Sequence, residues 1–305
     1  MPFSFLPLAL QAQPPLLHFA NGVRVVHSVT FDKTTLEDWA ELYNKTEIRQ
    51  LGEQSRSLYL EGESLDSLIQ SDAMQDAQFA IQFIAPMGNY LSIELTVGDQ
   101  GRVQAGRRFE RFAGTAWSRM AGFNGVTTQA AESLANGVFQ ILQSGNARMI
   151  NPLRMLEHGL INSNPYLRIF MWVSALDGIY MGVKTANFIE RLSKFLGATA
   201  PVFPAKDGVY FTRPTTVSDV AADLFSLRSE IAHGQEISEK FWRKSEDLRP
   251  LFPLSAYGPD SLRYLQLLEE SALSLLKQTL HKIILSGSLG DFSDVGVWRQ
   301  RMKML

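Results

Sequence analysis

The sequence predicts an α+β fold, in which a small N-terminal α/β domain with antiparallel strands is followed by a C-terminal all-α helical bundle. Two patterns lead to this prediction. Up to about residue 112, several stretches alternate apolar and polar residues with the period of two that is typical of strands. Beyond about residue 127, apolar residues recur every three or four positions, as in amphipathic helices. Because the glycine-containing stretch 121–128, AGFNGVTT, separates the patterns, we expect one domain over residues 1–125 and a second over residues 126–305.

The N-terminal domain is expected to contain several strands and one helix. Residues 22–31 have the pattern of a strand, and residues 34–51 have that of a helix. Residues 79–85, FAIQFIA, and residues 90–97, YLSIELTV, are predicted to form an antiparallel hairpin around a turn at Gly88 and Asn89. Residues 102–112 follow another turn and are predicted to form the third strand of this group.

The C-terminal domain is expected to be helical throughout, because apolar residues keep helical spacing over each of its longer stretches. The predicted helices occupy residues 128–143, 151–160, 166–182, 185–197, 217–233 and 261–285. The last residues, WRQRMKML, are basic and amphipathic, and we expect them to cap the bundle more readily than to contact RNA.

The composition of the chain argues against several classes of function. The chain has 305 residues, of which 45% are hydrophobic and 20% charged, and its formal net charge is -2, so no overall field favours nucleic acid or an anionic membrane as a partner. Cysteine is absent, which excludes disulfides, thiol nucleophiles and zinc–thiolate sites. None of the five histidines has other ligand residues at metal-site spacing, and no nucleotide-binding motif is present, so we expect neither a metal nor a cofactor.

We expect a cytoplasmic protein that does not enter a membrane. The apolar N-terminus lacks a cationic first segment and is interrupted by prolines, so it does not have the pattern of a signal peptide. The longest other apolar run, residues 166–183, contains Arg168 and Asp177, and therefore fits a buried helix better than a membrane span.

The predicted helix 217–233 carries the main candidate site. Thr216 and Asp219 have the spacing of a capping box, and Gly234 suits the left-handed position after a helix. At about 100° per residue, one narrow face is apolar and is expected to lie in the core. This face comprises Val220, Leu224, Leu227 and Ile231.

Arg228 and His233 lie outside the apolar face, about 140° apart around the helix. Small or apolar residues separate them, so a second helix is expected to approach closely there. These residues are Ala221, Phe225, Ser229 and Ala232. A twofold homodimer would place two copies of Arg228 and His233 in one cleft. Imidazole can transfer protons near neutral pH and guanidinium can bind a phosphate, which are the groups that RNA cleavage needs. Spacing alone is also compatible with a solvated arginine and a histidine at a helix terminus.

The stretch LRSEIAHG, residues 227–234, resembles the Arg-x4-6-His signature of the HEPN superfamily, and in particular the ApeA-like HEPN group. Upstream, FMWVSALDGIY is similar to an earlier helix of that group, with Asp177 where the family has glutamate. The resemblance covers residues 150–285 and implies an all-α fold. It further implies that Arg228 contacts the scissile phosphate, that His233 transfers protons, that Ser229 fills the polar position after the arginine, and that Asp177 orients Arg228 or His233.

Two functions remain open at this point. The first, which we favour, is a metal-independent endoribonuclease that acts as a homodimer, in antiphage defence or a toxin-like system, with the N-terminal domain sensing an unidentified trigger or positioning the substrate. The second is a noncatalytic RNA-binding or protein-interaction module on the same fold. Arg107, Arg108 and Arg111 alternate with aromatic residues in the segment GRRFERF and are further candidates for RNA contact, although a half-buried strand with a solvated face has the same pattern.

Overall fold

The computed structural model describes thirteen stretches of the chain. They are residues 3–8, 17–19, 22–27, 58–63, 76–77, 79–81, 83, 93–97, 103–107, 128–181, 184–202, 215–234 and 260–305. The chain divides into two compact units, Met1–Gln143 and Ser144–Leu305. This division follows α4 (Thr128–Gln143), whereas the sequence pattern places it before that helix, at residues 125/126.

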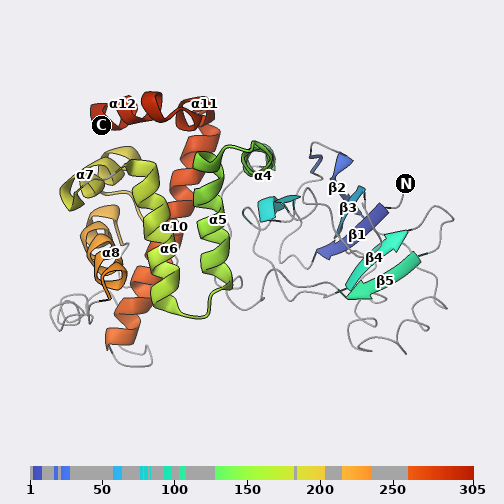
Figure 1. The fold of residues 1–305 in the computed structure, drawn as a ribbon, viewed down its shortest axis with the longest axis horizontal. Helices are drawn as coiled ribbons and strands as arrows, with labels where there is room; N and C mark the ends of the chain where they lie inside the picture. The colour runs from blue at the N-terminus through green and yellow to red at the C-terminus, as the bar shows by residue number, and fades with distance from the viewer. Residues whose placement is uncertain are drawn as a thin grey trace. The chain divides into compact units, whose positions relative to one another are not determined.

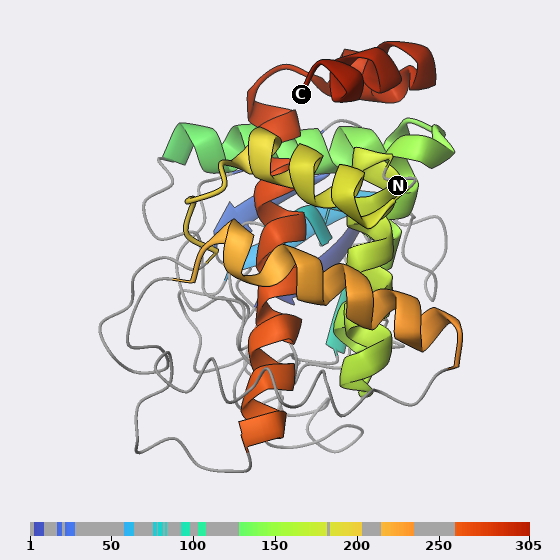
Figure 2. The ribbon, with the colours of Figure 1, turned by 90° about the vertical axis from the view of Figure 1, so that its left-hand side faces the viewer.

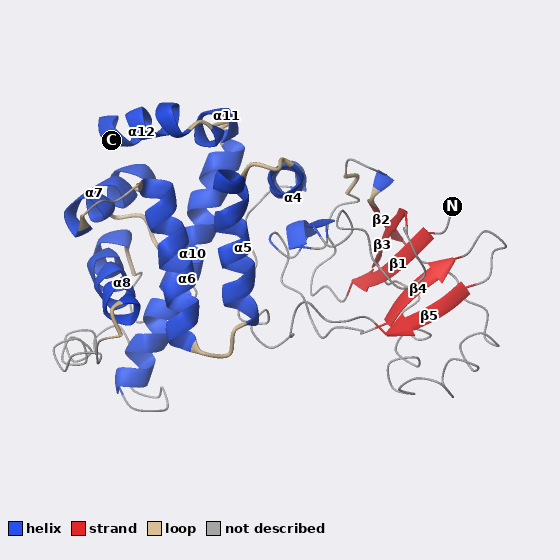
Figure 3. Ribbon diagram, viewed as in Figure 1, coloured by secondary structure: helices blue, strands red, loops and turns tan. Residues whose placement is uncertain are grey.

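The first unit contains an antiparallel sheet of described strands in the order β2-β3-β1-β4-β5 (Figure 3). The strands are β1 (Phe3–Leu8), β2 (Arg24–His27), β3 (Leu58–Glu63), β4 (Ile93–Val97) and β5 (Val103–Arg107). The predicted strands 22–31, 90–97 and 102–112 include β2, β4 and β5, and β4 pairs with β5 from Ile93 with Arg107 to Val97 with Val103. The α/β domain as a whole stays a prediction, because most of residues 1–125, including the predicted helix 34–51, lie outside the described residues.

The predicted hairpin of residues 79–85 and 90–97 is wrong. The described residues of the segment 76–83 are helical, and β4 pairs with β1 and β5 instead. Phe79, Ala80, Ile81 and Phe83 are all fully buried. A short apolar run that is buried on every side does not reveal its period, and it fits a helix as well as a strand.

α4 is fastened within the first unit by contacts to residues that lie far away in the sequence. The side-chain amide of Gln143 donates to the Asp76 carboxylate at 2.7 Å. The ring of Phe139 packs against that of Phe19, with a centroid separation of 5.0 Å. These contacts agree with the assignment of α4 to the first unit.

In the second unit the described residues form a helical bundle (Figure 1). α5 (Ala147–Ile161), α6 (Pro165–Tyr180) and α10 (Asp260–Leu285) run side by side along it. Figure 2 shows α7 (Thr185–Leu196) and α8 (Val217–Ala232) lying across α6 and α10. Two short helices, α11 (Leu289–Ser293) and α12 (Val295–Met304), lie at the end of α10. No helix in the described stretches is both long enough and apolar enough to cross a membrane.

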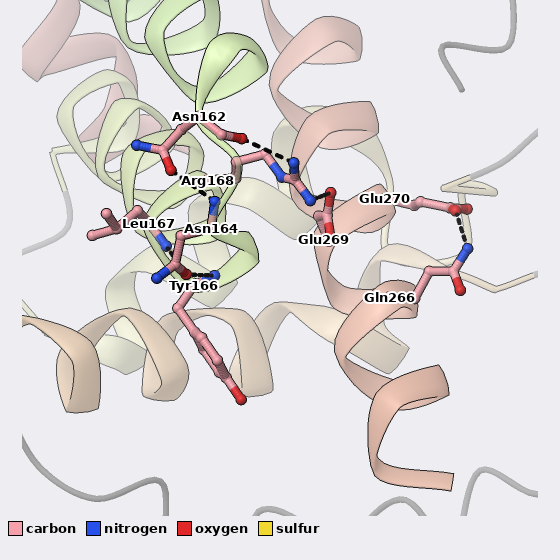
Figure 4. Close-up of polar contacts among 8 residues, drawn as sticks. All are labelled: Asn162, Asn164, Tyr166, Leu167, Arg168, Gln266, Glu269 and Glu270. Atoms are coloured by element: carbon pink, nitrogen blue, oxygen red, sulfur yellow. Dashed lines mark hydrogen bonds and ion pairs between the residues drawn. The ribbon is translucent and has the colours of Figure 1, made fainter. Parts of the chain in front are cut away.

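α6 is fixed at its first turn by local polar contacts (Figure 4). The Asn164 side chain accepts hydrogen bonds from the backbone N–H groups of Tyr166, at 2.9 Å, and Leu167, at 3.4 Å, as an N-cap does. The Arg168 guanidinium donates to the Asn162 carbonyl at 2.9 Å and forms an ion pair of 2.7 Å with Glu269 of α10. The start of α6 is therefore tied both to the preceding turn and to α10.

The rest of α6 is held by buried contacts. The Trp172 indole donates to the Leu156 carbonyl of α5 at 3.1 Å, and the hydroxyls of Tyr180 and Thr279 share a hydrogen bond of 2.8 Å. The C-terminal segment caps the bundle, as predicted, because Trp298 is buried and its indole donates to the Ile179 carbonyl at 2.7 Å. α6 thus has a fixed position from which its side chains can hold α8.

Candidate functional site

α8 begins and ends where its local sequence predicts. The Asp219 carboxylate accepts hydrogen bonds from the backbone N–H of Thr216 at 2.7 Å and from its hydroxyl at 2.8 Å. At the other end, His233 follows the last helical residue and Gly234 has a φ of +61°, in the left-handed region that favours glycine. The candidate residues therefore lie in the last turns of a well-delimited helix.

The apolar face of α8 is shorter than predicted. Val220, Leu224 and Leu227 are buried, but Ile231 is only partly covered. Ala232 and His233 are exposed. In Figure 2 the C-terminal end of α8 extends past α6, so the core does not reach the last turn of the helix.

Some of the small and apolar residues that separate Arg228 from His233 already contact other parts of the same chain. Phe225 packs against Phe188 of α7, with a centroid separation of 4.9 Å, and Ala221 is buried. The close approach expected from a second chain's helix is therefore met at Phe225 by α7. Ser229 is partly exposed and Ala232 is exposed.

Arg228 is held by α6 and by its own helix. Its Nε donates to the Ser174 hydroxyl at 3.3 Å, and its Nη2 lies 3.5 Å from Oδ2 of Asp177 in an ion pair. The guanidinium carbon lies 5.9 Å from the centroid of the Phe225 ring, within the range of a cation–π contact. The Arg228 side chain nevertheless keeps 29% of its surface exposed, so part of the guanidinium remains accessible.

His233 is exposed, and its backbone N–H donates to the Ser229 carbonyl at 3.1 Å. Within the part of the chain that the structure describes, no hydrogen bond joins the side chains of Arg228 and His233. The structure therefore brings Asp177 to Arg228 but does not bring Arg228 to His233 within one chain. This agrees with the helical projection, which places the two residues on different sides of α8.

The arginines of the segment GRRFERF are only partly covered by the structure. Arg107 is the last residue of β5 and pairs with Ile93. Arg108 and Arg111 lie outside the described residues. Their contact with RNA stays a prediction.

Several polar residues near α8 and on α10 were not foreseen. Ser174 was missed, although it lies three positions before Asp177 and thus on the same face of α6. The Tyr264 hydroxyl donates to the buried Asp223 carboxylate, and burial, followed by this hydrogen bond and the charge of Asp223, raises the pKa of Tyr264. Burial lowers the pKa of Lys277 on α10 to about 7.

No group of three or more His, Asp or Glu side chains that would hold a metal ion occurs among the described residues. Comparison of the chain with protein-family models, curated proteins and solved structures finds no match. The resemblance to HEPN domains therefore rests on the sequence motifs alone, and the function has to be argued from the geometry of α6 and α8.

Proposed function

We propose that α8 carries the catalytic groups of a metal-independent endoribonuclease of the HEPN type, which acts as a homodimer. Arg228 would bind the scissile phosphate and His233 would transfer protons. Asp177 would orient Arg228, and Ser229 would line the same end of the helix. A role in antiphage defence or a toxin-like system follows from the resemblance alone, as does a trigger sensed by residues 1–125.

One observation supports this proposal most directly. Arg228 is oriented by Ser174 and Asp177 while part of its guanidinium stays exposed, and an exposed His233 ends the same helix. Arg228 thus combines a fixed orientation with an accessible part of its guanidinium, and His233 is accessible to a substrate, as the proposed reaction requires.

The chemistry needs no group beyond those that two copies of α8 supply. In RNA, the 2′-hydroxyl oxygen attacks the adjacent phosphorus while the bond to the 5′-oxygen breaks, which yields a 2′,3′-cyclic phosphate and a free 5′-hydroxyl. One neutral imidazole accepts the 2′-hydroxyl proton, and one protonated imidazole donates a proton to the leaving oxygen. The guanidinium stabilises the negative charge that develops on the phosphoryl oxygens.

The homodimer would form at the last turn of α8. Ile231 is partly covered and Ala232 is exposed, so both add apolar surface there. A twofold axis at this turn would place each residue opposite its counterpart, and would bring the two His233 rings to one cleft. Phe225 would take no part, since it already packs against Phe188 of α7, and Ala221 would take none because it is buried within the chain.

The second candidate is a noncatalytic RNA-binding or protein-interaction module. The contacts of Arg228 with Ser174, Asp177 and Phe225 favour it, because they would also suit an arginine that fastens α8 to α6. On this reading His233 has no role in proton transfer. The two candidates predict different effects of replacing His233 on the cleavage of RNA.

The deciding experiment incubates the purified full chain with an RNA oligonucleotide in EDTA, beside the same oligonucleotide with 2′-O-methyl groups throughout. We expect cleavage of the unmodified RNA only, with 2′,3′-cyclic phosphate ends, and a loss of about a hundredfold or more in His233→Ala. His158→Ala is the matched control, because His158 is also exposed and also lies in the last turn of a helix.

The outcomes separate the candidates. If the wild type binds RNA without cutting it, and His233→Ala binds equally well, the noncatalytic module is the better description. If His233→Ala cuts as fast as the wild type, or cleavage persists on the 2′-O-methyl substrate, the proposed mechanism is wrong. If the wild type neither binds nor cuts RNA, the ribonuclease and the RNA-binding module are both wrong, and the protein-interaction module is the candidate that remains.

A further inference from the structure

We infer that Ser174 is a positioning residue, which together with Asp177 holds one edge of the Arg228 guanidinium against α6 and leaves its other edge for a phosphate. The part of this inference that concerns phosphate rests on the proposed function. The part that concerns the orientation of Arg228 rests on the contacts between α6 and α8.

The guanidinium group is planar and carries five N–H donors. Nε and Nη2 lie along one edge of this plane, and Nη1 and Nη2 lie along the adjacent edge. In this chain Nε donates to the Ser174 hydroxyl at 3.3 Å, and Nη2 faces the Asp177 carboxylate at 3.5 Å. Both partners therefore engage the Nε/Nη2 edge.

Ser174 and Asp177 can act together because they lie three positions apart on α6, so their side chains share one face of that helix. A single ion pair to Asp177 would fix one nitrogen but would let the plane turn about it. The second contact, at Nε, defines the plane. The Phe225 ring, which lies 5.9 Å from the guanidinium carbon and packs on Phe188, limits movement out of that plane.

The remaining edge is the one that would meet the substrate. Among the residues that the structure describes, none forms a hydrogen bond with Nη1 of Arg228, and 29% of the side chain is exposed. Two parallel N–H donors, one from each terminal nitrogen, match two oxygens of a phosphodiester. Phosphate would thus approach the Nη1/Nη2 edge of Arg228, which is adjacent to the edge that faces α6.

The test measures the guanidinium directly, by side-chain ¹⁵N NMR of the full chain. The Nε–H signal of Arg228 is assigned by its loss in Arg228→Lys, and its hydrogen exchange rate is then compared among variants. We expect exchange about three- to tenfold faster in Ser174→Ala, as for the loss of one hydrogen bond, and a rate near that of the wild type in Ser174→Thr, which keeps the hydroxyl.

Arg148 supplies an internal control in the same spectra. Its Nε donates to the Phe292 carbonyl at 2.9 Å, a bond that a change at Ser174 does not touch. If both arginines exchange faster in Ser174→Ala, the variant has loosened the fold, and the comparison is then repeated with Ser174→Thr and Ser174→Asn, which retain a polar acceptor. If Arg228 exchanges equally fast with and without an acceptor at position 174, the inference is wrong.

Cleavage of the RNA oligonucleotide gives the second measurement. A positioning role predicts that Ser174→Ala lowers kcat about tenfold with little change in KM, and that Ser174→Thr restores it. If the wild type does not cut RNA but the exchange result holds, the proposed function fails and the orientation of Arg228 stands. If the wild type cuts RNA and Ser174→Ala changes neither kcat nor exchange, the proposed function stands and the role of Ser174 fails.

Discussion

The two halves of α8 have opposite surroundings. The first half begins at a cap that Asp219 provides, buries Leu224, and accepts a hydrogen bond from Tyr264 at Asp223. The last turn leaves Ile231 partly covered and His233 exposed. One helix therefore combines a part that the bundle fixes with an end that remains open.

We therefore expect one half of α8 to contribute mainly to stability and the other half mainly to function. Residues in the first half are expected to matter for the free energy of unfolding, because their contacts are buried. Residues in the last turn are expected to matter little for unfolding, although they include the candidate catalytic group. The following predictions test this division, and they begin with the largest expected effect.

Replacing Leu224 with alanine tests the buried half most severely. Leu224 is fully buried, so Leu224→Ala should lower the free energy of unfolding by about 2–5 kcal/mol, from lost apolar contact and the cavity that remains. Ile231→Ala is the matched control at the open end and should cost about 1 kcal/mol or less. Urea denaturation followed by circular dichroism measures both, and equal losses would contradict the division of α8.

Replacing Tyr264 with phenylalanine tests the polar contact of the same half. The change removes a donor from the buried Asp223 carboxylate and should cost about 1–3 kcal/mol in the free energy of unfolding. Tyr166→Phe, at a partly exposed tyrosine, is the control and should be nearly neutral. A negligible effect of Tyr264→Phe would mean that this contact does not stabilise α8.

Tyr264→Phe should also change how the free energy of unfolding depends on pH. Because the pKa of Tyr264 is raised by burial and then by Asp223, the native state keeps a proton that the unfolded state loses near the ordinary tyrosine pKa of about 10. The contribution to stability is therefore present below about pH 10 and is lost as the pH rises above it. Tyr264→Phe should reduce this decline without abolishing it, because the pKa of Tyr180 is also raised, by burial.

The two termini of α8 give the smallest expected effects. Asp219→Ala removes the carboxylate that accepts a hydrogen bond from the Thr216 backbone N–H in the capping box, and should cost about 1 kcal/mol in the free energy of unfolding. His233→Ala should change it by no more than about 0.5 kcal/mol, because the side chain is exposed. Thermal unfolding of the two variants side by side measures the difference, and a larger loss from His233→Ala would show that the last turn is structural.

The sequence predicts α8 well because the signals that delimit it are local. Thr216, Asp219 and Gly234 all lie within two residues of a helix end and act through short-range contacts. The three positions that the apolar spacing predicts to be in the core up to Leu227 are all buried. The prediction fails at Ile231, since the spacing of residues records which side of a helix is apolar but not where the neighbouring helix stops.

Contacts between distant segments are the ones that the sequence does not reveal. β1 was missed because it contains Pro7 and pairs with β3, more than fifty residues away. Ser174 was missed because its partner Arg228 is 54 residues further along the chain. Asp177 was named only through the resemblance to HEPN domains. The predicted hairpin that begins at residues 79–85 is wrong because a short apolar run, whose described residues are all buried, does not show its period.

The candidate site also depends on Gly159 of α5, although this residue is not part of the site. A Cβ atom at this position would lie 2.2 Å from the indole nitrogen of Trp172, which is much closer than atoms can approach. Trp172 is buried and precedes Ser174 by only two residues on α6, so a single methyl group on α5 would have to displace a buried ring close in sequence to the serine that holds Arg228. Close packing between α5 and α6 at Gly159 thus supports the part of α6 whose side chains hold a guanidinium on a third helix.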